Sequence, residues 1–453
     1  MTLIPTYRCL DRRWVIGCSY WVVWAVFGTP AAFAGQPPSD PEPAQQVLSL
    51  DAAVRWGLMN NPELAALRQQ HGIAAAGVVI AQTYPFNPVW EGKIRAANGP
   101  EAAGITNHLS NEHKILIDVE VRHQGRYRRE TAAATLSRTD WEIASQEVAL
   151  SIRVVRAFNT VLYRQEKLRL IEDTVRRNEQ DVEEVRKLVE KEKVDNEELI
   201  LARIELDDSK AQVGPGQMAL TAALDELRRA LGVVDGAFTL QGSLENPPQQ
   251  WDSNALTQTA LEKRAELHAR QAAVNEAQGR LRLENANRFG NPNIGPAYEY
   301  DPARVNLIGA QITLPLPILN TRKGEILQRE AELTRVALEL RQTETQVRQD
   351  VQAALVRLEK ARAWQRTYQT QFFPRVRASL EDIERLRGKE KVDVVKLIEA
   401  RRKLLKPQDG YLDALWEVSQ AEADLAAAVG DPAFAVAPCL TAQGYKPAVA
   451  PKP

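Results

Sequence analysis

Hydrophobic and polar positions alternate in four short stretches of this chain, arranged as two pairs. Residues 115–121 and 308–316 place apolar side chains at every second position, which is typical of strands with one dry and one wet face. Weaker alternation in residues 90–96 and 294–300 predicts a partner strand shortly before each. Each half of the chain is therefore expected to form a β-hairpin.

The loops of these hairpins are expected around Asn98 to Asn111 and at Asp301-Pro302. Between and after the hairpins the hydrophobic period becomes helical. Apolar residues at three- and four-residue steps predict long helices over about 128–189 and 323–386. At about 1.5 Å per residue, each would span on the order of 90 Å. Helices of that length must pack side by side, as the wall of a rod or tube.

Shorter helices are expected before each hairpin, from Leu50 to Tyr84 and from about Leu256 to Asn287. Proline cannot continue a helix, so an Asn-Pro step is expected to end each one. These steps are Asn87-Pro88 and Asn291-Pro292.

One four-residue motif shows that the chain is duplicated. Glu192-Lys193-Val194-Asp195 recurs as Glu390-Lys391-Val392-Asp393, at an offset of 198 residues (390 − 192 = 198), and Leu199-Ile200 recurs as Leu397-Ile398 at the same offset. Such internal repetition indicates that the chain is built from two copies of one structural unit. Each copy lies where a long helix must turn, and a shorter helix returns from it to Gly232 or Gly430. We call residues 191–195 and 389–393 the first and second tip.

Glycine and proline are expected to kink or interrupt both returning helices. The breaks fall at Gly214-Pro215-Gly216 and at Pro407-Gln408-Asp409-Gly410. The sequence offers no functional account of either break.

The N-terminus has the features of a secretory signal. Arg8, Arg12 and Arg13 precede an apolar run from Trp14 to Phe27 and the small-x-small site Ala32-Phe33-Ala34. The alternatives are a membrane anchor or a lipoprotein through Cys18. The apolar run is short of the roughly 20 residues that span a bilayer, which favours cleavage and export. Cleavage leaves Cys439 as the single cysteine, so no internal disulfide is expected.

The expected organisation therefore has six parts. They are a signal peptide (1–34), a linker (35–49), a first repeat (50–233), an irregular inter-repeat segment (234–255) with room for a short strand, a second repeat (256–430) and a Pro/Ala-rich tail (431–453).

Composition supports a mainly helical protein with a small β part. The 453 residues include only 24 Gly, 25 Pro and 6% aromatic residues, a bias that favours long helices. A formal net charge of −1 gives no basic excess, so nucleic acid is not an expected partner.

Four strands cannot close a membrane barrel, which needs at least eight. Open edges and an apolar face would aggregate unless the strands pair with other copies. An exported oligomer satisfies both conditions, if its copies share one barrel in the outer membrane and their helices form a tube in the periplasm. The alternative is a secreted coiled-coil protein whose strands cap a rod.

Several segments between Leu50 and Asp431 form a recognisable series. They are Leu50 with Ala53 and Asn61-Pro62-Glu63-Leu64, Leu240-x-Gly242-x-Leu244 with Pro247, the two tips, Gln124-Gly125-Arg126, and Leu314-Pro315-Leu316-Pro317 with Asn320 and Gly324-Glu325. In these segments the chain resembles the TolC-like family of outer-membrane efflux proteins. The segments at Gln124 and Leu314 are most similar to the heavy-metal branch, the CzcC- and CusC-like channels.

The resemblance implies a homotrimer with a twelve-stranded barrel in outer-membrane lipid and a helical periplasmic tunnel. It also implies a periplasmic adaptor (a membrane fusion protein) and an inner-membrane pump, commonly of the RND class. Heavy-metal cations are the expected cargo. A drug efflux duct, a type I protein secretion duct and, in another class, a periplasmic structural or adaptor protein are the alternatives.

The family's tips contact the adaptor and close the resting entrance, so the tips are the candidate docking and gating sites. Their residues are Lys191, Glu192, Lys193, Val194 and Asp195, and Lys389, Glu390, Lys391, Val392 and Asp393. Glu192 and Glu390 stand where the family usually has glycine. Both charge signs at each turn favour a ring of ion pairs in an oligomer, against the alternative of a merely solvated turn. Glu399, one turn beyond the second tip, is a candidate lumen gate.

Three histidines lie around the first hairpin, His108, His113 and His123, but their spacing does not match a dedicated metal site. No nucleophile–base pair, phosphate loop or carboxylate dyad stands out. We therefore expect no metal site, no cofactor and no enzymatic activity.

Overall fold

The computed structural model describes residues 46–97, 108–234, 238–245, 251–301, 305–375, 378 and 405–432, all within the unit Gln45–Pro453. Its α-helices are α1 (Leu50–Asn60), α2 (Pro62–Gln82), α3 (Gln124–Glu190), α4 (Asn196–Ala211), α5 (Val213–Leu231), α6 (Ser253–Lys263), α7 (Ala265–Asn287), α8 (Lys323–Thr367) and α11 (Leu405–Val429). A π-helix, η2 (Tyr368–Phe372), continues α8. The strands are β1 (Gln46–Ser49), β2 (Val89–Ala97), β3 (His108–Asp118), β4 (Phe238–Gln241), β5 (Asn293–Tyr300) and β6 (Asn306–Thr313).

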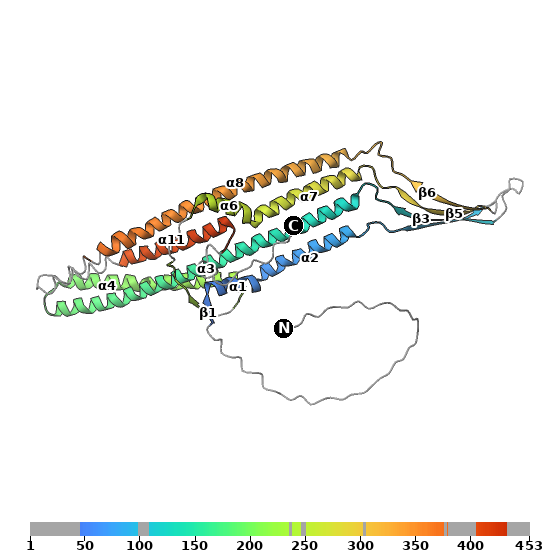
Figure 1. Ribbon diagram of the computed structural model, residues 1–453. Helices are drawn as coiled ribbons and strands as arrows, with labels where there is room; N and C mark the ends of the chain where they lie inside the picture. Colours follow the sequence, from blue (N-terminus) through green and yellow to red (C-terminus); the bar gives the residue numbers. More distant parts are fainter. Residues whose placement is uncertain are drawn as a thin grey trace, which may run out of the picture. The chain divides into compact units, whose positions relative to one another are not determined.

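Four helices form a layer that continues into a four-stranded antiparallel sheet. Helices α2, α3, α7 and α8 pack in that order, and the strand order is β2-β3-β5-β6. Each strand is joined in sequence to the helix at the same place in the layer, as Figure 1 shows. Among the described residues, β2 and β6 are therefore open edges of the sheet. None of the described helices is both long and apolar enough to cross a bilayer.

Both predicted hairpins are present, but their boundaries differ from the prediction. Strand β3 begins at His108, inside the predicted loop, because residues 108–111 pair with residues 94–97 of β2. It ends at Asp118 rather than at Val121. Strand β6 ends at Thr313, three residues before the predicted end, and Pro315 lacks the N–H that a ladder needs.

The shorter helices end before the Asn-Pro steps, at Gln82 and Asn287, and each is broken once. In the first repeat the break is Asn61, whose Oδ1 accepts the Leu64 N–H (3.1 Å) and whose Nδ2 donates to the Ala230 carbonyl (3.0 Å). The α6–α7 break is at Arg264.

These two breaks are equivalent positions of the duplicated unit. Gly232, with φ of 73°, ends α5 against Asn61 and Pro62, and Gly430, with φ of 78°, follows α11 and lies against Arg264. The left-handed conformation at each end favours glycine. The repeat seen in the sequence is thus also a repeat in packing.

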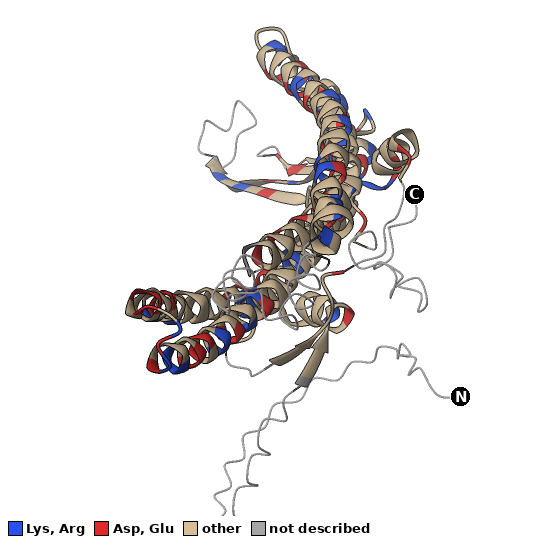
Figure 2. Ribbon diagram, turned by 90° about the vertical axis from the view of Figure 1, so that its left-hand side faces the viewer, with Lys and Arg blue, Asp and Glu red and all other residues tan. Residues whose placement is uncertain are grey.

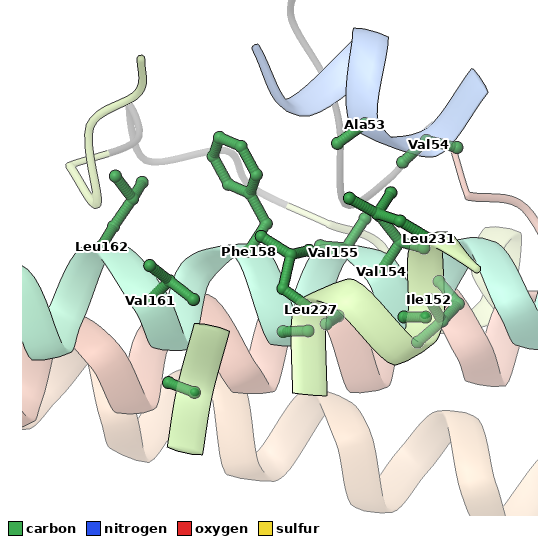
Figure 3. Close-up of a cluster of buried hydrophobic side chains, with 14 of the residues drawn as sticks. Ala53, Val54, Ile152, Val154, Val155, Phe158, Val161, Leu162, Leu227 and Leu231 are labelled. Carbon is green, nitrogen blue, oxygen red and sulfur yellow. The ribbon is translucent and has the colours of Figure 1, made fainter. Parts of the chain in front are cut away.

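The main apolar core lies where α1, α3, α5 and α11 meet the strand pair β1-β4. Phe158 at its centre is 1% exposed, among Val154, Leu162 and Leu227 (Figure 3). Strand β1 lies in the predicted linker and pairs with β4, the short strand expected between the repeats. A four-residue strand whose partner lies so far along the chain has no local signal.

The first predicted helix break is confirmed. Helix α4 ends at Ala211 and α5 begins at Val213, so that Pro215 occupies the first turn, where its missing N–H costs nothing. Pro407 and Gly410 lie within the described part of α11, so the part of the second predicted break that the structure describes is helical. The second long helix was predicted to end at about residue 386, which lies outside the described residues.

Candidate channel surfaces

One face of the four-stranded sheet is apolar and exposed. Cross-strand partners share a face, so the ladder places every second side chain together. The exposed large residues of this face are Trp90, Ile94, Leu109, Ile115, Tyr298, Ile308 and Ile312. Trp90 is 66% exposed and Ile308 is 86% exposed. No described part of the chain covers this face.

An aromatic stack crosses three strands on the apolar face. The ring of His113 is stacked between Trp90 (5.8 Å between centroids) and Tyr298 (6.4 Å). Its Nδ1 is buried without a hydrogen-bond partner among the described groups. His113 is therefore part of a packed stack. His108 begins β3, and His123 is exposed at the start of α3. Within the described ranges no cluster of His, Cys, Asp and Glu could hold a metal ion.

The opposite face of the sheet is polar. Glu112 at its centre lies 2.9 Å from Arg95 and 3.6 Å from Lys93, and it also pairs with Lys114. Among the described β3 residues on this face, Leu116 alone is both apolar and buried. The sheet thus presents charges on one side, together with the exposed Val89 and Leu307, and mainly apolar side chains on the other.

The helical layer also has a charged surface, which lines a cavity of about 740 Å³. Arginine and glutamate from α2, α3, α7 and α8 line it: Glu63, Arg138, Glu142, Arg153, Glu266, Arg270, Glu276, Arg280, Glu332, Arg335 and Glu339. Both charge signs recur along the helices in Figure 2. This surface could not be predicted from the sequence, because its residues come from four separated segments.

Glu276 is the centre of the ion pairs around this cavity. It is 4% exposed and accepts hydrogen bonds from Arg138 (2.7 Å) and Arg280 (2.5 Å). Arg280 also pairs with Glu332 (3.2 Å). Burial opposes the charge of Arg138, but its bonds to Glu276 and Glu142 outweigh burial and raise its pKa. The hydrogen bond from Arg329 holds the pKa of Glu332 below its ordinary value. The surface is lined with charges that largely neutralise one another.

The first tip is a tight turn between α3 and α4. The Lys193 N–H donates to the Leu188 carbonyl (2.9 Å) and the Glu192 N–H donates to the Val189 carbonyl (2.9 Å), which together form a Schellman motif. Glu192 takes the left-handed conformation of this motif, with φ of 54°. The turn geometry is therefore the one that glycine favours, although glutamate occupies it.

Four charged side chains of the first tip are exposed: Lys191, Glu192, Lys193 and Asp195. Val194 is half-buried. None of the four charges has an ion-pair partner within the described parts of the chain. Beneath the turn, Val185 and Leu199 form a small buried cluster. The second tip, Lys389 to Asp393, and Glu399 lie outside the described residues.

An exposed apolar strip on α4, which was not predicted from the sequence, lies next to the first tip. Its residues are Ile200, Leu201 and Ile204, each at least half exposed. The repetition of Leu199-Ile200 in the second half of the chain could have indicated this strip. An exposed apolar patch with polar residues at its rim is a feature of surfaces that bind another protein.

Polar contacts tie the two repeats together near the core. The Tyr163 hydroxyl donates to Asp413 of α11 (2.5 Å), and Lys167 lies 3.0 Å from Asp413 and 3.1 Å from Asp409. Burial disfavours the charge of Lys167, but its hydrogen bonds with Tyr163 and the two carboxylates raise its pKa. Burial also raises the pKa of Tyr163. The ion pairs therefore persist through the neutral range.

Solved structures with this fold include several outer-membrane channels. No family model and no curated protein sequence matches the chain. A crystal structure of CusC, from work on folding and transmembrane channel formation, superposes with a TM-score of 0.67 at 15% identity, covering 84% of this chain and 92% of that one. The open-state MtrE outer membrane channel of Neisseria gonorrhoeae gives a TM-score of 0.66 at 16% identity, covering 84% and 89%. The CmeC outer membrane channel of Campylobacter jejuni gives a TM-score of 0.64 at 13% identity, covering 84% and 85%.

At such low identity the likeness establishes the fold. The chain has the mostly helical fold, with a small β part, of these outer-membrane channels, as the sequence predicted.

Proposed function

We propose that this protein is the outer-membrane exit duct of a tripartite efflux system. The observation that carries the proposal is the two-faced sheet. Its apolar face is exposed and its edges β2 and β6 are open, an arrangement that water tolerates poorly and a membrane barrel requires. The fold shared with solved outer-membrane channels supports it.

Three copies close the barrel in this proposal. Pairing β6 of one copy with β2 of the next gives twelve strands and removes every edge. The edge helices also carry exposed apolar residues that a neighbouring copy would cover. These are Ile73 and Ile80 on α2 and Leu327 and Leu338 on α8.

The polar face of the sheet then lines a passage across the outer membrane, and the charged surface of the helices lines its periplasmic extension. Neutralised ion pairs suit a passive conduit, because neither charge sign is strongly attracted or repelled. The duct catalyses no reaction and needs no cofactor. An N-terminal signal peptide would direct the chain to the periplasm.

The tips face the periplasm in this arrangement. We propose that both contact a periplasmic adaptor, and through it an inner-membrane pump of the RND class. The unpaired charges of the first tip and the α4 strip support this role. The role of the second tip is proposed because its sequence repeats that of the first, and Glu399 is proposed as a lumen gate. Heavy-metal cations as cargo rest on the similarity of Leu314 to Glu325 to the heavy-metal branch.

The oligomer is the first point to test. The full chain, expressed with its own N-terminus, should fractionate with the outer membrane and require detergent. It should run on native gels at a mass near three times that of one chain. A soluble monomer recovered from the periplasm would overturn the proposal.

The tips are tested by charge reversal. Lys193→Glu combined with Lys391→Glu should weaken adaptor binding several-fold and raise leakage of large antibiotics, since each tip exchanges one of its two lysines for an acid. Arg169→Glu with Arg177→Glu, exposed on α3 and away from the tip, is the matched control. Unchanged sensitivity and adaptor binding at normal trimer levels would contradict the role of the tips.

A further inference from the structure

Four connections join the helices to the strands, and we call them the collar: residues 83–88, 119–123, 288–292 and 314–322. They lie between the helical layer and the sheet in Figure 1. Side chains within and next to the collar hold these connections together, as the following contacts show.

The first connection joins the second through Tyr84, whose hydroxyl accepts the Glu120 N–H (3.3 Å). The second joins the third because the Val119 N–H donates to the Pro292 carbonyl (2.8 Å). The third joins the fourth because Pro315 packs directly on Gly290. The collar is therefore one continuous surface.

Large apolar side chains of the collar are exposed. They are Val121, Leu314, Leu316, Ile318 and Leu319. Leu319 is 99% exposed. Val121 lies three residues after the end of β3, and Leu314 directly follows β6. The surface that avoids water therefore extends beyond the strands.

Two cations of the collar meet at one aromatic ring. The Arg122 guanidinium lies 3.7 Å from the centroid of Phe289, and that of Arg288 lies 5.6 Å from the same centroid. Both arginines are exposed. Neither has an ion-pair partner in the part of the chain that the structure describes.

Three glutamates near the collar are already paired with other arginines, and Asp118 accepts a hydrogen bond from Asn293 (3.2 Å). Glu120 pairs with Arg128, Glu130 with Arg126 (2.7 Å), and Glu284 with Arg322 (3.2 Å). Two like charges lie beside one ring, and no carboxylate among the described residues pairs with either of them. Two neighbouring guanidinium groups of this kind suit an anionic ligand.

We propose that the collar binds the anionic phospholipid headgroups of the leaflet on the helical side of the sheet. The inference rests on the proposed membrane position of the sheet. Guanidinium groups bind phosphate oxygens in bidentate fashion. Aromatic and basic residues beside an apolar band are what the membrane–water interface selects. Arg122 and Arg288 hold the phosphate, and Leu316, Ile318 and Leu319 enter the acyl region.

The test measures the thermal stability of the detergent-purified full chain during titration with phosphatidylglycerol or with phosphatidylcholine. Phosphatidylglycerol should raise the melting temperature more than phosphatidylcholine does. The excess should disappear in Arg122→Gln/Arg288→Gln and remain in Arg122→Lys/Arg288→Lys, which keeps both charges. It should also remain in Arg169→Gln/Arg177→Gln, which removes two cations from α3. At about 1 M salt the excess should shrink, because the screening length falls to about 3 Å.

Equal shifts with both lipids, or a full excess in the Gln/Gln variant, would overturn the collar proposal. Insertion into neutral vesicles distinguishes this failure from failure of the proposed function. A chain that inserts in neutral vesicles but ignores lipid charge contradicts the collar alone. A chain that inserts in neither neutral nor anionic vesicles overturns both proposals.

Discussion

Two regions of this protein have similar apolar side chains and opposite exposure. Around Phe158, residues from helices of both repeats are almost completely buried. In the four-stranded sheet, Trp90, Ile94 and Ile308 are mostly exposed. The first region buries its apolar side chains within one chain. Under the proposed function, the second region is covered by lipid. The comparison therefore separates the residues that stabilise the fold from those that serve the proposed function.

The largest expected effect is in the buried region. Phe158→Ala removes a side chain that is 1% exposed, and such truncations cost about 3–5 kcal/mol. Met218→Ala on the surface of α5 should change stability by less than about 0.5 kcal/mol. Chemical unfolding of the detergent-solubilised protein measures both. A small effect at Phe158 would mean that the core does not hold the repeats together.

A second prediction compares Ile308 and Leu307, which are neighbours in β6 and lie on opposite faces of the sheet. Ile308→Lys places a charge on the apolar face and should cost about 2–4 kcal/mol of membrane stability if the residue lies near the bilayer centre. Leu307→Lys places the same charge on the polar face, across from Glu299, and should cost much less. Folding titrations into vesicles compare them, and equal losses would contradict the assignment of the faces.

The smallest effect is expected at the first tip. Glu192→Gly relieves a left-handed glutamate and should stabilise the turn by about 1 kcal/mol. Glu184→Gly, exposed inside α3, should destabilise the helix by about 1 kcal/mol. Amide hydrogen exchange of residues 185–199 reports both changes. Faster exchange in Glu192→Gly would show that the side chain makes contacts worth more than its strain.

Sequence periodicity predicted the helices and the hairpins because those signals are local. The 198-residue repeat predicted two equivalent halves, and the matching joints at Gly232 and Gly430 are its physical form. Strand ends were less predictable. Pairing in the hairpin extends β3 back to His108, whatever the composition of the loop.

Features that depend on distant contacts were not predicted. Strand β1 exists because it pairs with β4, and the cavity depends on Glu276 meeting Arg138 across 138 positions. The π-helix at Tyr368 has no signature in the hydrophobic period. The exposed charges of the first tip were predicted, but the geometry that accommodates Glu192 required the structure.

Accessibility of two introduced cysteines in β6 tests the central claim most directly. In a chain whose natural cysteines are replaced by serine, Ile308→Cys and Leu307→Cys are compared in the native membrane and in vesicles. The thiol of the Leu307→Cys variant should react with a hydrophilic maleimide, whereas a fluorophore attached in the Ile308→Cys variant should be quenched by brominated lipid. If water-soluble reagent reaches both positions equally and lipid quenches neither, the sheet does not lie in a membrane and the duct is excluded.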